Sequence, residues 1–207
     1  MEQIMGRFTV ISEWIYLLFV IQMFWLIGAV IGLGLFGIIP STLAMFAVFR
    51  KRLQDGDVDI IKTFWNTYRT MFFKSQLTGL FWILLGLFLY YDIRILFNYQ
   101  NTFGFIIGAI LISVLLIYLL ATMILMPMNV HYEMTSSNRV RLSVMIAITM
   151  PHISIGLTLS TILVYFIATY IPILFLLCGI SLAAFLYMKC SQNAFTKVEA
   201  TGYIRNF

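Results

Sequence analysis

The chain has 207 residues, of which 62% are hydrophobic and 10% are charged, and its mean hydropathy is +0.98. Soluble domains carry about 25% charged residues, so this composition excludes an ordinary water-soluble protein and predicts an all-α, polytopic transmembrane helical bundle. The formal net charge of +5 predicts basic cytoplasmic loops beside anionic lipid headgroups and no nucleic-acid partner, because excess Lys and Arg in membrane proteins gather there.

Four stretches of the sequence contain no Asp, Glu, Lys or Arg, namely Trp14–Phe49, Ser75–Tyr91, Ile95–Tyr132 and Leu142–Met188. A bilayer crossing needs about 20 consecutive apolar residues, so the first and last stretches are too long for one simple helix each. No segment is polar enough to form a separate soluble domain, and residues 1–207 are expected to form a single integral membrane domain.

The first span is predicted over residues 12–31, and a helix break is predicted after it. Several glycines and then Pro40 follow the span, and proline suits the first turn of a new helix. A short helix is therefore expected over residues 41–53. Its apolar part is about ten residues, which is too short to cross a bilayer alone. Two interpretations stay open: a re-entrant helix, or a short return span after Pro40.

Residues 58–74 follow a turn at Gly56-Asp57 and show the clearest amphipathic pattern of the chain. Their apolar residues recur at helical spacing, and their polar residues fall on the opposite side. This pattern predicts a helix in the headgroup region, and the alternative is a helix whose apolar side packs against the protein's own bundle. The candidate interfacial or partner surface consists of Lys62, Trp65, Tyr68, Arg69 and Lys74.

The remaining apolar segments predict four more spans and a tail. The spans are expected over residues 75–91, 103–126, 142–167 and 173–188, and Pro151 interrupts the third of these four. The polar residues 189–207 are expected to form a tail outside the bilayer.

The distribution of Lys and Arg predicts the orientation. If Arg50–Lys74 is cytoplasmic and the spans alternate from there, every Lys and Arg lies inside except Arg94 and, with five crossings, Arg7. This is the bias that the positive-inside rule describes. A return span after Pro40 would bring Arg7 inside as well, and the side of the N-terminus therefore stays open. Both versions place residues 189–207 in the cytoplasm.

Polar side chains inside the predicted spans are few, and the two candidates are Gln22 and His152. Gln22 is expected to form an interhelical hydrogen bond. His152 follows Pro151, so it would either line a kink or bond a backbone carbonyl that the proline leaves free. Ionisable groups inside a membrane usually mark transport or proton pathways, and their scarcity here weakens that interpretation.

Motifs for chemistry are absent from the sequence, which contains no nucleophile elbow, phosphate-binding Gly loop, paired catalytic carboxylates or metal-ligand spacing. We therefore expect no catalytic residues, no cofactor and no metal, and a protein that is not an enzyme. The remaining candidates for chemistry are His131, Glu133 and Asn129 near the end of one span. Two or three such residues without partners point only weakly to acid–base or metal chemistry.

Several short features follow one another in a recognisable order. They are Gly37-Ile38-Ile39-Pro40-Ser41-Thr42, Arg50-Lys51, Gly56-Asp57, Tyr90-Tyr91-Asp92 and Met126-Pro127. This order resembles the YesL-like family of small bacterial integral membrane proteins, a family of unknown function. The family has no established catalytic residues, so the resemblance implies none. Genes of this family often lie beside genes for carbohydrate ABC transporters and polysaccharide-degrading enzymes. The resemblance therefore implies an association with these proteins.

Three hypotheses of function follow from these observations. The first is a non-enzymatic accessory or scaffold protein of the bacterial cytoplasmic membrane, associated with carbohydrate uptake or utilisation. It would contact carbohydrate ABC transporter subunits or anionic lipid headgroups through residues 57–74. The second is a small transporter or channel for a neutral solute such as a sugar, using Gln22 and His152. The third is an enzyme of lipid-linked sugars built on His131 and Glu133.

Overall fold

The computed structural model describes the backbone of residues 2–98, 102–132 and 134–200, and the side chains of 10–34, 36–96, 104–132 and 134–196. The elements are α1 (Glu2–Ile31), α2 (Leu35–Asp55), α3 (Ile60–Asn98), α4 (Thr102–His131), α5 (Ser136–Thr149), α6 (Pro151–Tyr170), α7 (Pro172–Leu174), the π-helix η1 (Phe175–Gly179) and α8 (Ile180–Ala200).

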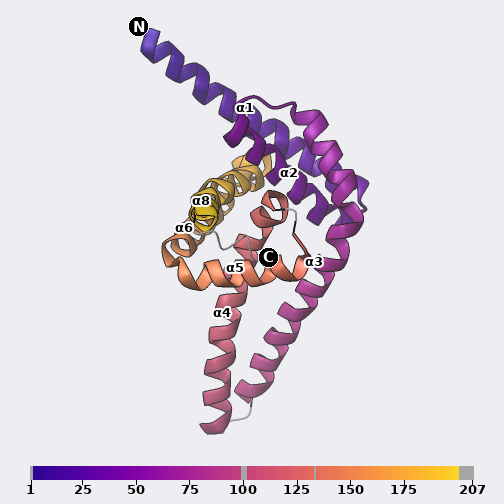
Figure 1. Ribbon diagram of the computed structural model, residues 1–207, viewed down its shortest axis with the longest axis vertical. Coiled ribbons are helices and arrows are strands. Elements are labelled where there is room, and N and C mark those ends of the chain that lie inside the picture. The colour runs from indigo at the N-terminus through magenta and orange to yellow at the C-terminus, as the bar shows by residue number, and fades with distance from the viewer. Residues whose placement is uncertain (1, 99–101, 133, 201–207) are drawn as a thin grey trace.

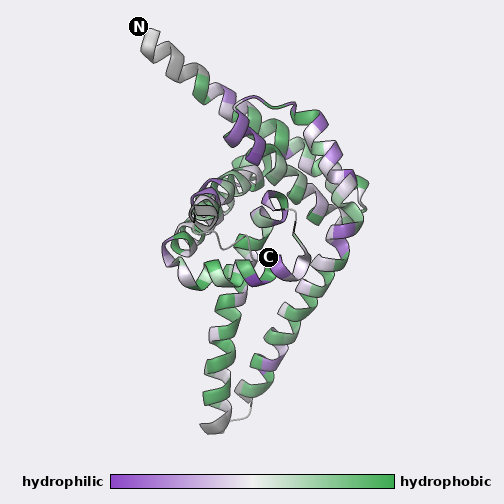
Figure 2. Cartoon of the chain, in the orientation of Figure 1, coloured by the Kyte–Doolittle hydropathy of each residue, from purple (hydrophilic) through white to green (hydrophobic). Residues whose placement is uncertain are grey.

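Five segments of the described chain are long and apolar enough to cross a membrane. They are Val10–Ile31, Ile60–Leu96, Gly104–His131, Pro151–Tyr170 and Pro172–Thr196. These segments confirm the predicted all-α fold with five apolar spans. In Figure 1 the second half of α3 and α4 form a two-helix arm, while α6 and α8 lie side by side, seen nearly end-on. Figure 2 shows that the arm is mostly hydrophobic.

The break after the first span lies at Leu33 and Gly34, directly after the predicted end of the span at residue 31, and the next helix begins earlier than the expected residue 41. Both residues have positive φ angles, 56° and 76°, and the chain reverses there. Pro40 lies inside α2, so it does not begin the second helix. A proline inside a helix leaves the carbonyl four residues earlier without its usual donor. The amide of Gln76 on α3 donates a hydrogen bond to that carbonyl, on Phe36, which explains why α2 tolerates Pro40.

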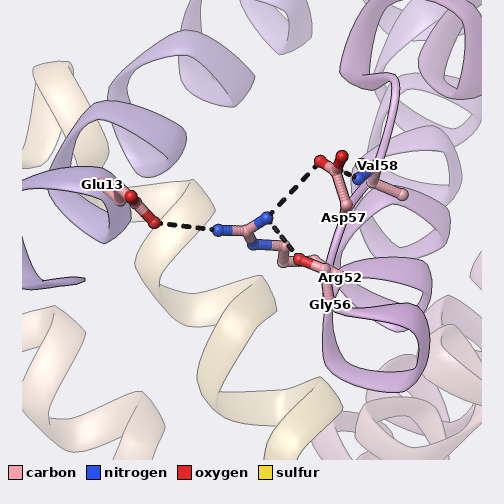
Figure 3. A network of polar contacts seen from close by, with 5 residues as sticks. All are labelled: Glu13, Arg52, Gly56, Asp57 and Val58. Carbon is pink, nitrogen blue, oxygen red and sulfur yellow. Dashed lines mark hydrogen bonds and ion pairs between the residues drawn. The ribbon is translucent and has the colours of Figure 1, made fainter.

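Helix α2 runs back along α1 and ends beside the beginning of the α1 span. Arg52, near the end of α2, lies 3.3 Å from the carboxylate of Glu13, as Figure 3 shows. At about 1.5 Å per residue α2 is about 31 Å long. The short helix is longer than the expected 41–53: it spans Leu35–Asp55 and runs back along α1, and it is not among the five described segments that are apolar enough to cross a membrane.

The centre of the packed core is formed by α2, which contacts α1, α3, α4 and α8. Every side chain from Leu43 to Phe49 is buried. Small residues of α2 and α1 allow this close packing: a Cβ added to Gly37 would lie 2.5 Å from the carbonyl oxygen of Ala29. Protein therefore covers α2 on several sides, and less of its surface is left to face lipid.

The amphipathic segment 58–74 is not a separate helix. It continues without a break into the predicted span 75–91, and the two form the single helix α3. Its apolar side packs against the protein itself, since Phe64 and Tyr68 are buried and the Tyr68 hydroxyl donates a 2.8 Å hydrogen bond to the carbonyl of Gly28. The alternative of an amphipathic helix packed on its own bundle therefore describes the structure.

The predicted span 142–167 is divided at Met150 into α5 and α6. Pro151 takes the first position of α6, where its missing N–H costs no helical hydrogen bond. Helix α5 runs across the arm in Figure 1 and buries Leu142 and Ile146 in a cluster with Met128 of α4. The fourth candidate span is thus Pro151–Tyr170, shorter than expected.

The predicted boundary at residue 189 is also absent, because α8 continues to Ala200. Ser191, Ala194 and Phe195 of the expected polar tail are buried. The Phe195 ring stacks on the imidazole of His131, with 4.6 Å between the ring centroids. This part of the tail therefore belongs to the packed core.

Candidate functional site

A cavity of about 1110 Å³ lies between α2, α3, α4 and the beginning of α5. Its size slightly exceeds that of ordinary small-molecule sites, which are about 300–1,000 Å³. Hydroxyl and amide groups, aromatic rings and cations line it, and no Asp or Glu belongs to the lining in the described part of the chain. The polar and aromatic lining residues are Arg50, Lys51, Thr63, Asn66, Thr67, Thr70, Phe73, Lys74, Ser75, Thr78, Trp82, Tyr118, Thr122, Asn129, Tyr132, Ser136 and Arg139.

Trp82, Tyr118 and Thr122 line the end of the cavity where α3 and α4 meet. The Trp82 indole donates a 2.7 Å hydrogen bond to the Thr122 hydroxyl, and the Tyr118 hydroxyl donates a 2.8 Å bond to the Trp82 carbonyl. The Trp82 and Tyr118 rings stack with centroids 4.9 Å apart. These contacts fix two aromatic rings at the neutral end of the cavity.

The other end of the cavity is cationic, because Arg50 and Arg139 both contact the last residues of α4. Arg50 comes from α2, and its guanidinium donates to the carbonyls of Val130 and His131. Arg139 comes from α5 and donates a 2.7 Å hydrogen bond to Oδ1 of Asn129. The C-terminus of a helix carries a partial negative charge that favours such cations.

Both guanidiniums are incompletely paired. The Nε atoms of Arg50 and Arg139 are buried and have no hydrogen-bond partner among the described residues. Burial also lowers the pKa of the Arg139 guanidinium, because desolvation disfavours the charged form. Arginine nevertheless stays protonated at neutral pH, so this end of the cavity holds two partly desolvated positive charges.

Acidic side chains lie in a smaller neighbouring cavity of about 280 Å³, lined in part by Asp55, Asp57, Asp59 and Lys62. Two of the carboxylates stabilise the α2–α3 loop. Asp57 accepts a 2.8 Å hydrogen bond from its neighbour's backbone N–H, which Figure 3 shows beside Arg52. Asp59 accepts a 3.0 Å bond from the backbone N–H of Lys62, as a helix cap does.

The predicted partner surface is divided by the structure. Lys62, Arg69 and Lys74 are exposed, and Lys74 also lines the large cavity. Trp65 is half-buried, with its ring against that of Phe24 at 6.5 Å. Tyr68 is 5% exposed, so its place on a surface was wrong: its hydroxyl bonds to α1 within the core.

The two predicted intramembrane polar residues differ in environment. Gln22 is buried, and its Oε1 accepts a 2.9 Å hydrogen bond from the backbone N–H of Ser181, just after the π-helix η1. This is the interhelical bond that the sequence predicted. His152 is exposed in the first turn of α6 and lines neither of the two cavities.

The residues proposed for enzyme chemistry have other contacts. The His131 ring stacks on Phe195 and meets the Tyr132 ring edge-on. Asn129 accepts a hydrogen bond from Arg139, and Glu133 lies outside the described residues. Within the described residues, no group of three or more His, Cys, Asp or Glu side chains could hold a metal ion.

The sequence did not single out Arg50 or Arg139 as site residues. They are 89 positions apart in the sequence and appeared there as ordinary members of two basic loops. The one signal that could have connected them is the positive-inside rule, which assigns both loops to the same membrane face.

Comparison with known proteins finds a matching family model and several similar bacterial proteins. A family model described as a protein of unknown function, DUF624, matches residues 18–93, which cover about half of α1, all of α2 and most of α3. The chain is 29% identical to the uncharacterised protein YteU of Bacillus subtilis, over 96% of this chain and 89% of YteU.

Two further proteins of the same bacterium are similar. The uncharacterised protein YesL is 24% identical over 90% of this chain and 88% of its own length. The uncharacterised protein YesV is 35% identical over 53% of each chain. No solved structure matches the chain. These matches confirm the resemblance to the YesL-like proteins: residues 18–93 match the DUF624 family model, and the chain is a distant homologue of YteU and YesL.

Proposed function

We propose that this protein is a non-enzymatic accessory or scaffold component of the bacterial cytoplasmic membrane that supports carbohydrate uptake. The observation that carries the proposal is the use of polar side chains within the spans, which join helices to one another. Gln22 bonds α1 to Ser181 of α8, and the hydroxyls of Thr161 and Tyr187 join α6 to α8 at 2.6 Å. Such bonds stabilise a fixed bundle and leave those groups less available for a solute.

The partner surface in this proposal is the exposed side of the first half of α3. Lys62, Arg69 and Lys74 are exposed there, while the opposite side is fixed by Phe64 and Tyr68 in the core. A rigid, cationic helix face suits an acidic protein surface or anionic lipid headgroups. The association of YesL-like genes with carbohydrate ABC transporters suggests the transporter subunits as the protein partner.

The orientation belongs to the same proposal, with Arg50–Lys74 and the C-terminus in the cytoplasm. The α1–α2 hairpin supports a cytoplasmic N-terminus as well, because the Glu13–Arg52 ion pair brings the two ends of the hairpin together. Labelling tests this in a Gln54→Cys variant whose Cys178 and Cys190 are replaced by alanine. A membrane-impermeant maleimide should label it only after the cells are opened, and labelling of intact cells would refute the orientation.

Co-purification and uptake test the accessory role. The tagged full-length chain, extracted in a mild detergent, should retain a carbohydrate ABC transporter subunit, and deletion of the gene should lower sugar uptake. Charge reversal at Lys62 and Arg69 should reduce that retention, whereas Arg94→Glu, a reversal at an exposed site near the far end of α3, should not. Unchanged uptake after deletion, together with no retained subunit, would reject the role.

The large cavity favours a second candidate function, a small transporter or channel for a neutral solute such as a sugar. Outside the cationic end, its hydroxyl and amide lining would suit the hydroxyl groups of a polar, uncharged molecule. Purified protein in liposomes should then give saturable uptake of labelled sugar. A flux equal to that of empty liposomes would count against this function.

A further inference from the structure

The cationic end of the cavity carries positive charge that the accessory role does not use. Arg50 and Arg139 approach consecutive residues of α4, since one binds Val130 and the other binds Asn129. Their contacts are to neutral oxygens, and neither arginine takes part in the ion pairs between described side chains, which involve Arg52. The two charges at the end of α4 are therefore not neutralised by a described carboxylate.

Each guanidinium keeps donors that have no described acceptor, the Nε–H among them. In both arginines a terminal nitrogen is bonded to α4, while the Nε–H is buried without a described partner. A buried unpaired donor on a charged group is unfavourable, and an oxyanion is the acceptor that best offsets it. Phosphate and carboxylate are the groups that the guanidinium fork binds in two-point geometry.

The first turn of α5 adds to this positive potential. Ser136 and Arg139, both in that turn, line the cavity, and the preceding residue, Thr135, makes no side-chain capping bond. Backbone N–H groups at a helix N-terminus favour anions. The arginines of α2 and α5 and the N-terminus of α5 itself thus converge on one region.

The opposite end of the cavity defines the rest of the ligand. Trp82, Tyr118 and Thr122 form an aromatic and hydroxyl-bearing wall there. Hydroxyl and amide groups of Thr63, Asn66 and Thr70 line the space along α3. Such a wall suits a polar remainder that carries hydroxyl groups and no strong charge.

We propose that this cavity is a binding site for a hydroxylated organic anion, whose phosphate or carboxylate binds Arg50 and Arg139. The ligand comes either from the headgroup of an anionic phospholipid or from a soluble sugar phosphate or sugar acid, since both carry this chemistry. Arg50 and Arg139 are separate from Lys62 and Arg69, the exposed α3 cations whose reversal tests the partner surface, and Lys74 borders both regions. The failure of the ligand site and the failure of the accessory role are therefore distinguishable.

Binding to the purified full-length chain in phosphatidylcholine nanodiscs tests the soluble source. The probes are glucose 6-phosphate, glucuronate and glucose, which share a hydroxylated ring and differ in charge, titrated at constant ionic strength and followed by tryptophan fluorescence and by the melting temperature. At least one of the two anions should bind saturably and raise the melting temperature, and glucose should bind at least about tenfold more weakly.

Nanodiscs of phosphatidylcholine mixed with phosphatidylglycerol test the lipid source. Native mass spectrometry of the released protein should then show retained phosphatidylglycerol, and occupancy by this lipid should abolish binding of the soluble anions. Binding of soluble anions alone, or retention of the lipid alone, supports the site and identifies its source. Neither binding nor retention overturns the proposal.

Variants assign the binding to the two arginines. Arg50→Gln and Arg139→Gln should each weaken anion binding by about tenfold to a hundredfold, while Arg141→Gln, an exposed position on α5 outside the cavity lining, should not. Unchanged binding in both cavity variants, or an equal loss in Arg141→Gln, would contradict the site. If a cavity variant fails to fold, the comparison of charged and neutral probes on the unmodified chain still decides the proposal.

Glu133 provides one further control, because its side chain lies outside the described residues and it follows α4 closely in the sequence. If its carboxylate already neutralises the arginines, anions will bind only to the Glu133→Gln variant. That result would assign the cationic end to an internal ion pair and overturn the ligand site.

Discussion

Replacement of Gln22 by leucine should remove a buried hydrogen bond with little change in side-chain volume. Gln22 is 1% exposed and Ser181 is fully buried, and the Gln22 Oε1 lies 2.9 Å from the Ser181 backbone nitrogen. Ser181 follows the π-helix η1 by two residues. Since π-helical pairing joins residues five apart, in place of four, groups at its end need other partners, and Gln22 supplies one.

The expected loss of unfolding free energy in Gln22→Leu follows from the broken hydrogen bond to Ser181. The variant removes the side-chain acceptor of the buried Ser181 N–H, and loss of one partner of a buried hydrogen bond costs about 1–3 kcal/mol. This is more than the loss of about 0.6 kcal/mol that is average for a polar contact between membrane helices. Asparagine, one methylene shorter, keeps the amide but draws it away from Ser181, so Gln22→Asn should lose the same bond.

Unfolding of the purified protein by sodium dodecyl sulfate in mixed micelles measures the free energies of unfolding. Gln54→Leu is the matched control, because Gln54 is exposed near the end of α2 and such surface changes stay within about 0.5 kcal/mol. If Gln22→Leu also stays within about 0.5 kcal/mol of the unmodified chain, the bond to Ser181 does not stabilise the bundle and our explanation of η1 is wrong.

Three further predictions concern stability in the same assay. Tyr68→Phe should lower the free energy of unfolding by about 1 kcal/mol, the usual value of a hydrogen bond, and an equal effect of Tyr91→Phe, at an exposed site, would contradict this. Gly37→Ala should lower the free energy of unfolding by more than about 2 kcal/mol, because the new Cβ would lie 2.5 Å from an α1 carbonyl oxygen and overpacking costs about that much. Gly156→Ala should be tolerated, since its Cβ would make an ordinary 3.5 Å contact. Arg52→Met should cost less than about 1 kcal/mol, since its ion pairs are exposed and surface pairs contribute little, and a larger loss would show that the pair fixes the hairpin.

The existence of the spans could be predicted from the sequence because lipid sets a simple requirement. A lipid-facing helix must be apolar over about 20 residues, and uncharged stretches satisfy this requirement visibly. Helix boundaries depend on local geometry and were less predictable. Pro151 does begin a helix, at α6, whereas Pro40 does not, because a side chain from α3 binds the carbonyl that Pro40 leaves unpaired.

The continuity of α3 could not be read from hydropathy either. The charged residue Lys74 marked a boundary between an amphipathic segment and a span, yet lysine is a good helix former and nothing in the local sequence stops the helix there. Only the tertiary contacts of Tyr68 and Gln76 with α1 and α2 reveal that the first half of α3 belongs to the packed core.

The return path of α2 and the cationic end of the cavity depend on each other. Hydropathy detects helices that face lipid, and α2 is enclosed by α1, α3, α4 and α8, so its sequence is under a weaker requirement to be apolar. Because α2 continues as far as Asp55, Arg50 reaches Val130 at the end of α4. A re-entrant helix that ended halfway would leave Arg50 short of α4, and Arg139 would then be the one arginine there. The anion site therefore requires the return helix, and both would be lost by any change that shortens α2.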